Sequence, residues 1–114
     1  MSGARAQTRR WLAQRASAAV LALCVAVHLA TMIVAVRDGL TAAEILARTR
    51  GSIAWASFYG VFVVAVAIHA PIGLRVVLSE WAGARGRAVD IALAVFALVL
   101  FVLGIRAVVA VVAP

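Results

Sequence analysis

Three long apolar runs alternate with short polar stretches along the chain. The first run covers residues 16–36, the second extends from residue 53 to about residue 78, and the third extends from about residue 89 to residue 112. Each run has about the 20 apolar residues that a helix needs to cross roughly 30 Å of hydrocarbon. Backbone polar groups in lipid must be hydrogen-bonded within their own segment, so the pattern predicts three transmembrane helices.

The polar stretches between the runs predict short connecting elements. Thr41 and Glu44 have the spacing of a capping box, which indicates a short amphipathic helix over about residues 41–49, with its apolar residues on the membrane surface. The second connection contains the sequence AGARGR, which is typical of a tight turn. We therefore expect an all-α membrane protein in which residues 1–114 form a single membrane-anchor domain.

The composition agrees with this class of protein. Of the 114 residues, 67% are hydrophobic and 13% are charged, whereas about 45–50% of residues are apolar in soluble domains. The net charge is +7, which could indicate binding to nucleic acid. The arginines, however, lie mostly at the ends of the apolar runs, as in membrane proteins. We therefore expect a lipid bilayer and no nucleic acid among the partners.

The distribution of arginines predicts the orientation. Arginines are most frequent before the first run and between the second and third runs. Loops with more Lys and Arg remain on the cytoplasmic side, so the N-terminus should lie inside and the C-terminus outside. The first run is too long for the apolar region of a signal peptide, which has roughly 7–15 residues, so it should remain in the mature protein.

Most common catalytic signatures are missing from the sequence. It contains no glycine-rich phosphate loop, no zinc-ligand spacing and no Ser/His/Asp set. Cys24 lies within the first apolar run and is the one cysteine, so it should be a small buried apolar residue. The chain does not look like a hydrolase.

Two histidines, His28 and His69, lie within the apolar runs. An ionisable side chain inside a membrane is unfavourable by a few kcal/mol, and this makes each histidine a functional candidate. Two interpretations are open for them. A neutral imidazole can form a hydrogen bond between helices, or it can be an axial ligand of haem iron.

The segment IHAPIGLR, residues 68–75, surrounds His69 with unusual residues for a membrane helix. Gly73 lies four residues after His69, on the same helix face, and would let a flat porphyrin approach the backbone. Pro71 removes a backbone donor and permits a kink. Arg75 lies near the inner end of the run, where it could bind a haem propionate or extend to the interface as an anchor.

These residues resemble a known family. The pattern HxxxGxR, from His69 through Gly73 to Arg75, is similar to the second helix of the cytochrome b membrane anchors of succinate dehydrogenase and fumarate reductase. The resemblance implies that His69 ligates a b-type haem. The three-helix layout, the size and the inside N-terminus also match, so the resemblance covers nearly the whole chain.

A second stretch before the first run adds to the resemblance. The sequence QRASA, residues 14–18, is similar to the family's His-Arg-x-Ser-Gly. This implies that Arg15 lines a quinone site, with Ser17 and Trp11 as further candidates. The departures are Gln14 in place of histidine, alanine in place of the final glycine, and Trp11 where the family often has serine.

The resemblance implies a non-catalytic electron-transfer subunit in the respiratory chain of a bacterial inner (cytoplasmic) membrane. Flavin and iron–sulfur chemistry would occur on a flavoprotein and an iron–sulfur subunit docked at the inner, Arg-rich face. The implied cofactors are haem b and a quinone, either ubiquinone or menaquinone. The second haem ligand would come from a separate membrane anchor subunit.

Other arrangements are also open. The depths of His28 and His69 should differ by roughly 8–12 Å, so the two should not share one iron. A homodimer could instead hold an inner haem between two copies of His69 and an outer haem between two copies of His28. Arg106 would then bind an outer propionate or else extend into the interface. A haem-free scaffold or a small transporter subunit is the remaining alternative.

Overall fold

The structure, a computed structural model, describes residues 2–114. It consists of the helices α1 (Ser2–Asp38), α2 (Ala42–Thr49), α3 (Ile53–Trp81) and α4 (Arg87–Val112), and these residues include no strand. By length and composition, α1, α3 and α4 can each cross a membrane. The predicted fold class, an all-α membrane protein with three spanning helices, is therefore confirmed.

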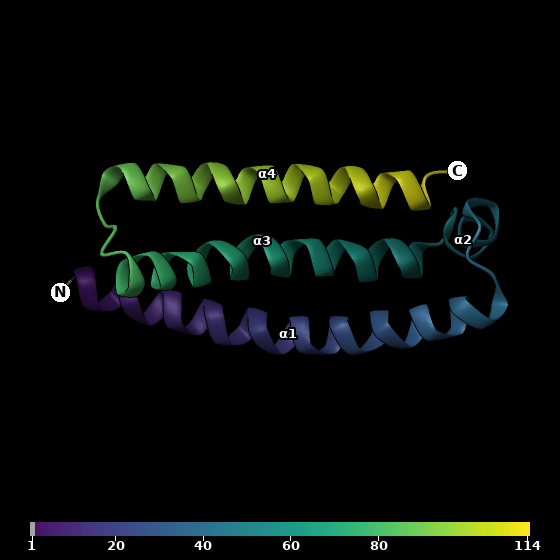
Figure 1. Cartoon of the computed structure of the whole chain (residues 1–114), viewed down its shortest axis with the longest axis horizontal. Helices are drawn as coiled ribbons and strands as arrows, with labels where there is room; N and C mark the ends of the chain where they lie inside the picture. The colour runs from purple at the N-terminus through teal and green to yellow at the C-terminus, as the bar shows by residue number, and fades with distance from the viewer. Residues whose placement is uncertain (1) are drawn as a thin grey trace.

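Helix α3 occupies the middle of the molecule. It packs against both α1 and α4 and is antiparallel to each of them (Figure 1). The N-terminus and the α3–α4 connection lie at one end, whereas α2 and the C-terminus lie at the other (Figure 1). The molecule measures 52 × 25 × 22 Å along its principal axes, so its long axis exceeds the roughly 30 Å of a hydrocarbon layer.

Small side chains form much of the buried interface between the helices. The residues with less than a tenth of their surface exposed within the three long helices are Ser17, Cys24, Ala35, Ala65 and Leu93. Small residues let helix backbones approach closely, which favours packing in lipid, where the hydrophobic effect contributes little. The prediction that Cys24 is a small buried apolar residue is confirmed.

One glycine lies at a close approach of α3 and α4. A Cβ atom added to Gly104 would lie 2.5 Å from the Cγ1 atom of Val63 and 3.2 Å from its Cβ. Valine is stiff at χ1 and cannot easily turn aside. The packing of these two helices therefore depends on the missing side chain at position 104.

Helix α1 begins well before the first apolar run. It has 37 residues, which corresponds to about 55 Å at 1.5 Å per residue. Its first turns carry Arg5, Arg9 and Arg10, all exposed. Alanine, arginine and glutamine are good helix formers, so the helix continues out of the apolar region as a charged extension.

At the opposite end, α2 begins with the predicted capping box. The Glu44 N–H donates to Thr41 Oγ1 at 3.2 Å, and the Thr41 N–H donates to a Glu44 carboxylate oxygen at 3.0 Å. The pKa of the Glu44 carboxyl is lowered, mainly by the hydrogen bond from the Thr41 backbone and to a smaller extent by the Thr41 side chain. The Thr49 hydroxyl donates to the Val111 carbonyl at 2.6 Å, which ties α2 to the end of α4.

Candidate functional site

We call the half of the bundle that contains the N-terminus and the α3–α4 connection the inner half, and the half that contains α2 the outer half (Figure 1). Polar side chains of the inner half meet at the α1–α3 interface. Ser17 on α1 is buried, and its Oγ lies 3.4 Å from Nδ1 of His69 on α3. The same hydroxyl lies 3.1 Å from the backbone carbonyl of Gln14, to which it donates. The antiparallel pairing of α1 and α3 therefore brings together two candidates that are 52 positions apart in the sequence.

The face of α3 beside His69 is covered by a side chain from α1. A Cβ atom added to Gly73 would lie 3.2 Å from Nε2 of Gln14. The Oε1 atom of Gln14 is buried and has no hydrogen-bond partner among residues 2–114. The amide thus occupies the space that the sequence analysis assigned to a flat ligand, without satisfying its own oxygen there.

These observations bear on whether the residues fit a haem. His69 is half-buried, and Ser17 engages its Nδ1, which leaves Nε2 as the atom available to a metal. Gln14 can turn away from Gly73 without breaking a hydrogen bond to its Oε1. The donor set therefore fits a haem ligated by His69, provided that the Gln14 side chain moves off Gly73.

Arg75 is engaged within the chain. Its guanidinium forms an ion pair with the carboxylate of Asp90, which joins α3 to the first turn of α4. Arg75 was expected to bind a propionate or to anchor at the interface, and Asp90 was not expected to be a site residue. The sequence did contain a clue to this ion pair, because Asp90 and Glu80 are the two acidic residues of the inner half and therefore the possible partners of Arg75 there.

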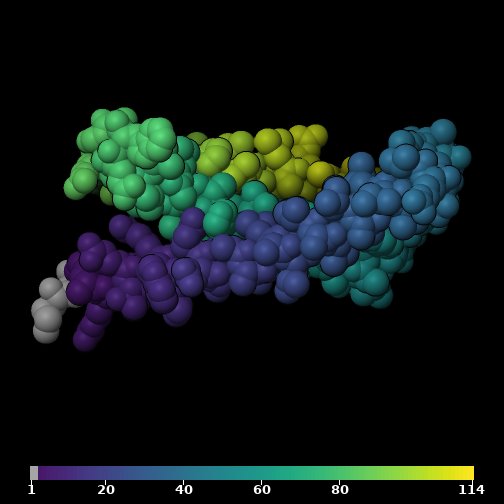
Figure 2. Space-filling model, turned by 60° about the horizontal axis from the view of Figure 1, so that its bottom comes forward, coloured from purple at the N-terminus to yellow at the C-terminus, as the bar shows by residue number. Residues whose placement is uncertain are grey.

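A polar basin lies beside this ion pair. It has a volume of about 430 Å³ and is lined by residues of α1, α3, the α3–α4 connection and α4, including Gln7, Arg10, Ser79 and Arg85. Figure 2 shows a notch between the N-terminal part of α1 and the α3–α4 connection at this end. The basin combines several cationic groups with hydroxyl and amide groups, so it can bind an anionic or carbonyl-bearing head group.

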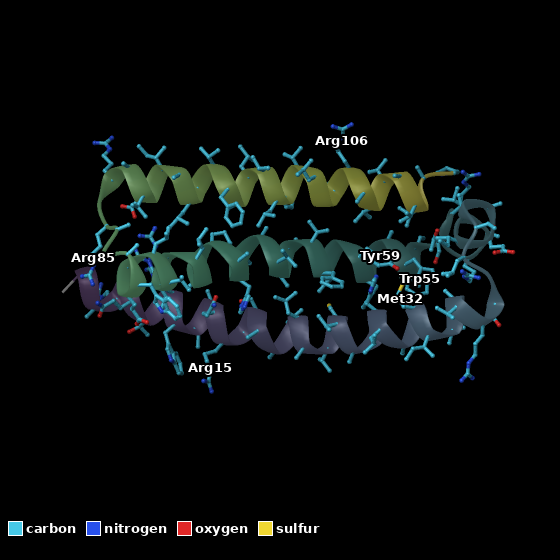
Figure 3. All side chains as sticks on the ribbon, viewed as in Figure 1. Arg15, Met32, Trp55, Tyr59, Arg85 and Arg106 are labelled. Carbon is cyan, nitrogen blue, oxygen red and sulfur yellow. The ribbon has the colours of Figure 1, made fainter. Side chains whose placement is uncertain are left out.

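Arg15 and Trp11 lie on a different face of α1 from Ser17. The Arg15 guanidinium stacks over the Trp11 ring, 5.5 Å from its centroid, and both side chains are exposed. Arg15 points away from α3 (Figure 3). Two residues correspond to about 200° around a helix, so Arg15 and Ser17 cannot face the same neighbour. The three quinone candidates are not brought together within this chain.

His28 lies in the outer half, among aromatic rings. Its ring is edge-on to Tyr59 and Phe62, with centroid separations of 6.1 and 5.9 Å. Tyr59 in turn stacks on Trp55, with centroids 5.4 Å apart (Figure 3). No pattern along the sequence links these aromatic residues to His28, and only the helix pairing shows that Tyr59 and Phe62 adjoin it.

A cavity of about 610 Å³ adjoins this cluster. His28, Tyr59, Phe62 and apolar residues of α3 and α4 line it, and α2 contributes Ile45 and Thr49. Arg106, the expected partner of an outer propionate, is exposed on α4 and points away from the other helices (Figure 3). The structure therefore separates Arg106 from the cavity beside His28.

The two histidines are far apart in depth. Ser17, which faces His69, precedes His28 by eleven residues on the same helix, and this corresponds to about 16 Å along the axis. The packing thus keeps the imidazoles on separate levels, as expected for ligands that do not share an iron. Among residues 2–114, no cluster of three or more His, Cys, Asp or Glu is present.

The chain matches a protein-family model. The model of the succinate dehydrogenase/fumarate reductase transmembrane subunit matches residues 1–111. Neither the curated proteins nor the solved structures compared with the chain give a match.

Proposed function

The chain belongs to the succinate dehydrogenase/fumarate reductase transmembrane subunit family, and on that premise we propose that it is the haem-b-binding membrane anchor of such a complex. The observation that carries the proposal is the imidazole of His69, inside a spanning helix and engaged through Nδ1 by buried Ser17. Its Nε2 would ligate the iron. A bound haem would supply a one-electron redox centre within the membrane.

The surroundings of His69 support this role. The membrane core offers no water to a polar atom that lacks a partner, so the free ring nitrogen is favoured only when something binds it. Gly73, one turn along α3, leaves room for a macrocycle once the Gln14 amide turns aside. The ring is therefore held through Nδ1 while Nε2 remains available to a ligand.

The Arg-rich end is the proposed docking face. Seven of the eleven arginines lie before the first apolar run or in the α3–α4 connection and its flanks, which favours a cytoplasmic position for that end. We place the N-terminus inside and the C-terminus outside, in a bacterial inner membrane. The iron–sulfur and flavoprotein subunits would bind there, and catalysis on the dicarboxylate would occur on the flavoprotein.

The quinone, ubiquinone or menaquinone, would bind near the same end. Arg15 and Trp11 are exposed on a face of α1 that does not contact α3, so their site would be completed by a partner subunit. The polar basin beside Arg75 and Asp90 is open to the same end of the molecule. Both surfaces lie close to the proposed docking face, which would shorten the electron path.

A second arrangement has one specific observation in its favour. The cavity beside His28 is large enough for a bulky apolar ligand, so a homodimer could hold an outer haem there in addition to the inner one. In the first arrangement, a separate anchor subunit supplies the second ligand for one haem. The haem content per chain separates these two arrangements.

Purification of the intact complex in mild detergent tests the proposal. We expect a b-type band in the reduced-minus-oxidised spectrum, and a flavoprotein and an iron–sulfur protein among the subunits. A pyridine haemochrome assay gives the haem per chain. A complex with both partner subunits but no b-type band would refute the haem assignment, and the absence of both partners would refute the anchor function.

A further inference from the structure

We propose that Ser17 is a positioning residue for His69: its hydroxyl oxygen accepts a hydrogen bond from Nδ1–H and thereby fixes the tautomer in which Nε2 is free to bind metal. The inference rests on the proposed function for the identity of the metal group, but the tautomer itself is a property of this chain alone. It gives Ser17 a role other than quinone binding.

The Ser17 hydroxyl has a single proton to donate. Two acceptors compete for it, the Gln14 carbonyl at 3.1 Å and Nδ1 of His69 at 3.4 Å. The carbonyl is the nearer, and a serine three residues along a helix commonly donates to such a carbonyl. With its proton directed at Gln14, Oγ can contact the ring only as an acceptor, so Nδ1 must carry the hydrogen.

The burial of Ser17 strengthens the preference for the Nδ1–H tautomer. Ser17 is 5% exposed, so water cannot replace either of its bonds. In the opposite tautomer the hydroxyl must either leave the nearer Gln14 carbonyl and donate to Nδ1 at 3.4 Å, or leave the lone pairs of Oγ and Nδ1 facing each other in an apolar interface, and both arrangements are less favourable. The α1–α3 packing therefore selects Nδ1–H, and Nε2 retains its lone pair.

The same contact should tune a bound metal. A hydrogen bond from the distal ring N–H of a ligating histidine raises the basicity of the coordinating nitrogen, and loss of such a partner typically weakens metal affinity 10–100-fold. A more basic ligand stabilises the ferric state relative to the ferrous state. Removal of the Ser17 oxygen should therefore raise the midpoint potential and weaken haem retention.

The chain offers a matched control for this substitution. Ser79 on α3 forms the same type of bond, from its hydroxyl to the carbonyl three residues earlier, at 3.1 Å. It lies at the inner end of α3, ten residues beyond His69. Ser79→Ala removes an equivalent hydroxyl without touching the imidazole, and Ser17→Thr retains the hydroxyl at the interface.

The first measurement needs no haem. The full chain, labelled with ¹⁵N-histidine and reconstituted without haem in phospholipid bilayers, is examined by solid-state NMR, and the His69 signals are assigned by their loss in His69→Gln. We expect Nδ1 to be protonated in the parent, Ser17→Thr and Ser79→Ala proteins, and a mixture of tautomers in Ser17→Ala. Protonated Nε2 in the parent, or an unchanged tautomer in Ser17→Ala, would overturn the inference.

The second measurement uses the haem-containing complex. We expect Ser17→Ala to raise the midpoint potential and to lower haem affinity about tenfold, whereas Ser17→Thr and Ser79→Ala should match the parent. A tenfold change in the ferric-to-ferrous preference corresponds to 59 mV for a one-electron couple. Equal potentials in Ser17→Ala and Ser79→Ala would contradict the tuning role. If the parent complex holds no haem, the proposed function fails, and the NMR result alone decides the tautomer.

Discussion

The inner and outer halves of the bundle hold a histidine in two different ways. In the inner half, a buried hydroxyl engages one nitrogen of His69, and a glycine lies one turn away. In the outer half, His28 meets the edges of two aromatic rings and borders a large apolar cavity. The same residue type in the same membrane is thus oriented by a hydrogen bond at one level and by ring packing at the other.

The difference shows what prepares an imidazole for metal binding. A hydrogen bond assigns the proton to one nitrogen and leaves the other nitrogen as a donor to a metal. Aromatic edges restrict the ring without assigning the proton. We therefore expect the inner half to contain the haem ligand, and the outer half to tolerate other rings at position 28.

The same substitution at the two histidines gives the largest expected contrast. His69→Phe should abolish the b-type absorption band, because no other described side chain of the inner half can replace the lost nitrogen. His28→Phe should retain the band, since a third ring fits beside Tyr59 and Phe62. Haem content is measured by the pyridine haemochrome assay in both purified complexes. A full band in His69→Phe would refute His69 as the haem ligand. A halved band in His28→Phe would favour the two-haem dimer.

The packing of α3 against α4 in the outer half can be tested by adding one methyl group at position 104. Gly104→Ala should destabilise the fold by about 1–3 kcal/mol, because the new Cβ overlaps Val63. Gly60→Ala is the matched control, since an added Cβ there meets nothing within 4 Å, and it should stabilise α3 by about 0.5–1 kcal/mol. Thermal unfolding in detergent measures both. Val63→Ala should restore much of the loss in Gly104→Ala, and a Gly104→Ala protein as stable as Gly60→Ala would refute the contact.

The ion pair of the inner half should contribute less. Asp90→Asn removes the partner of Arg75 across α3 and α4. The two side chains are 29% and 52% exposed, so we expect a loss of about 0.2–1 kcal/mol, reduced further by salt. Unfolding at low and high salt measures it, with Glu80→Gln as the control for lost charge. An equal effect of the two variants at low salt would mean that the pairing itself contributes nothing.

The smallest expected effect is the pH dependence of α2 in the outer half. The folded-state pKa of Glu44 is lowered by its bonds with Thr41, so its contribution is present above the unfolded pKa of about 4.3 and is lost as pH falls through the lower folded value. The protection factors of the α2 amides, which compare the measured exchange rate with the intrinsic rate at the same pH, should fall below about pH 4. Thr41→Ala should show low protection at every pH, and parent protection factors that do not change with pH would contradict the capping contribution.

Part of the candidate site could be predicted from the sequence. His69, Gly73 and Ser17 stand out in the sequence because polar or missing side chains are conspicuous in apolar runs, and the structure brings Ser17 and His69 together. Gln14 and Asp90 were not selected as site residues, although they contact Gly73 and Arg75. Their partners lie on other helices, and the pattern along one helix does not reveal which neighbour a polar residue will meet.

The sequence by itself determined the number of spanning helices and the capping box, because lipid requires uninterrupted apolar length and backbone bonds within each segment. The tertiary structure alone decided which helix faces meet: Ser17 with His69, His28 with the aromatic rings, and Arg15 turned outward. Helix rotation and relative register are fixed by close packing at small residues such as Ala65 and Gly104. These contacts join positions far apart in the chain, where no local periodicity could indicate them.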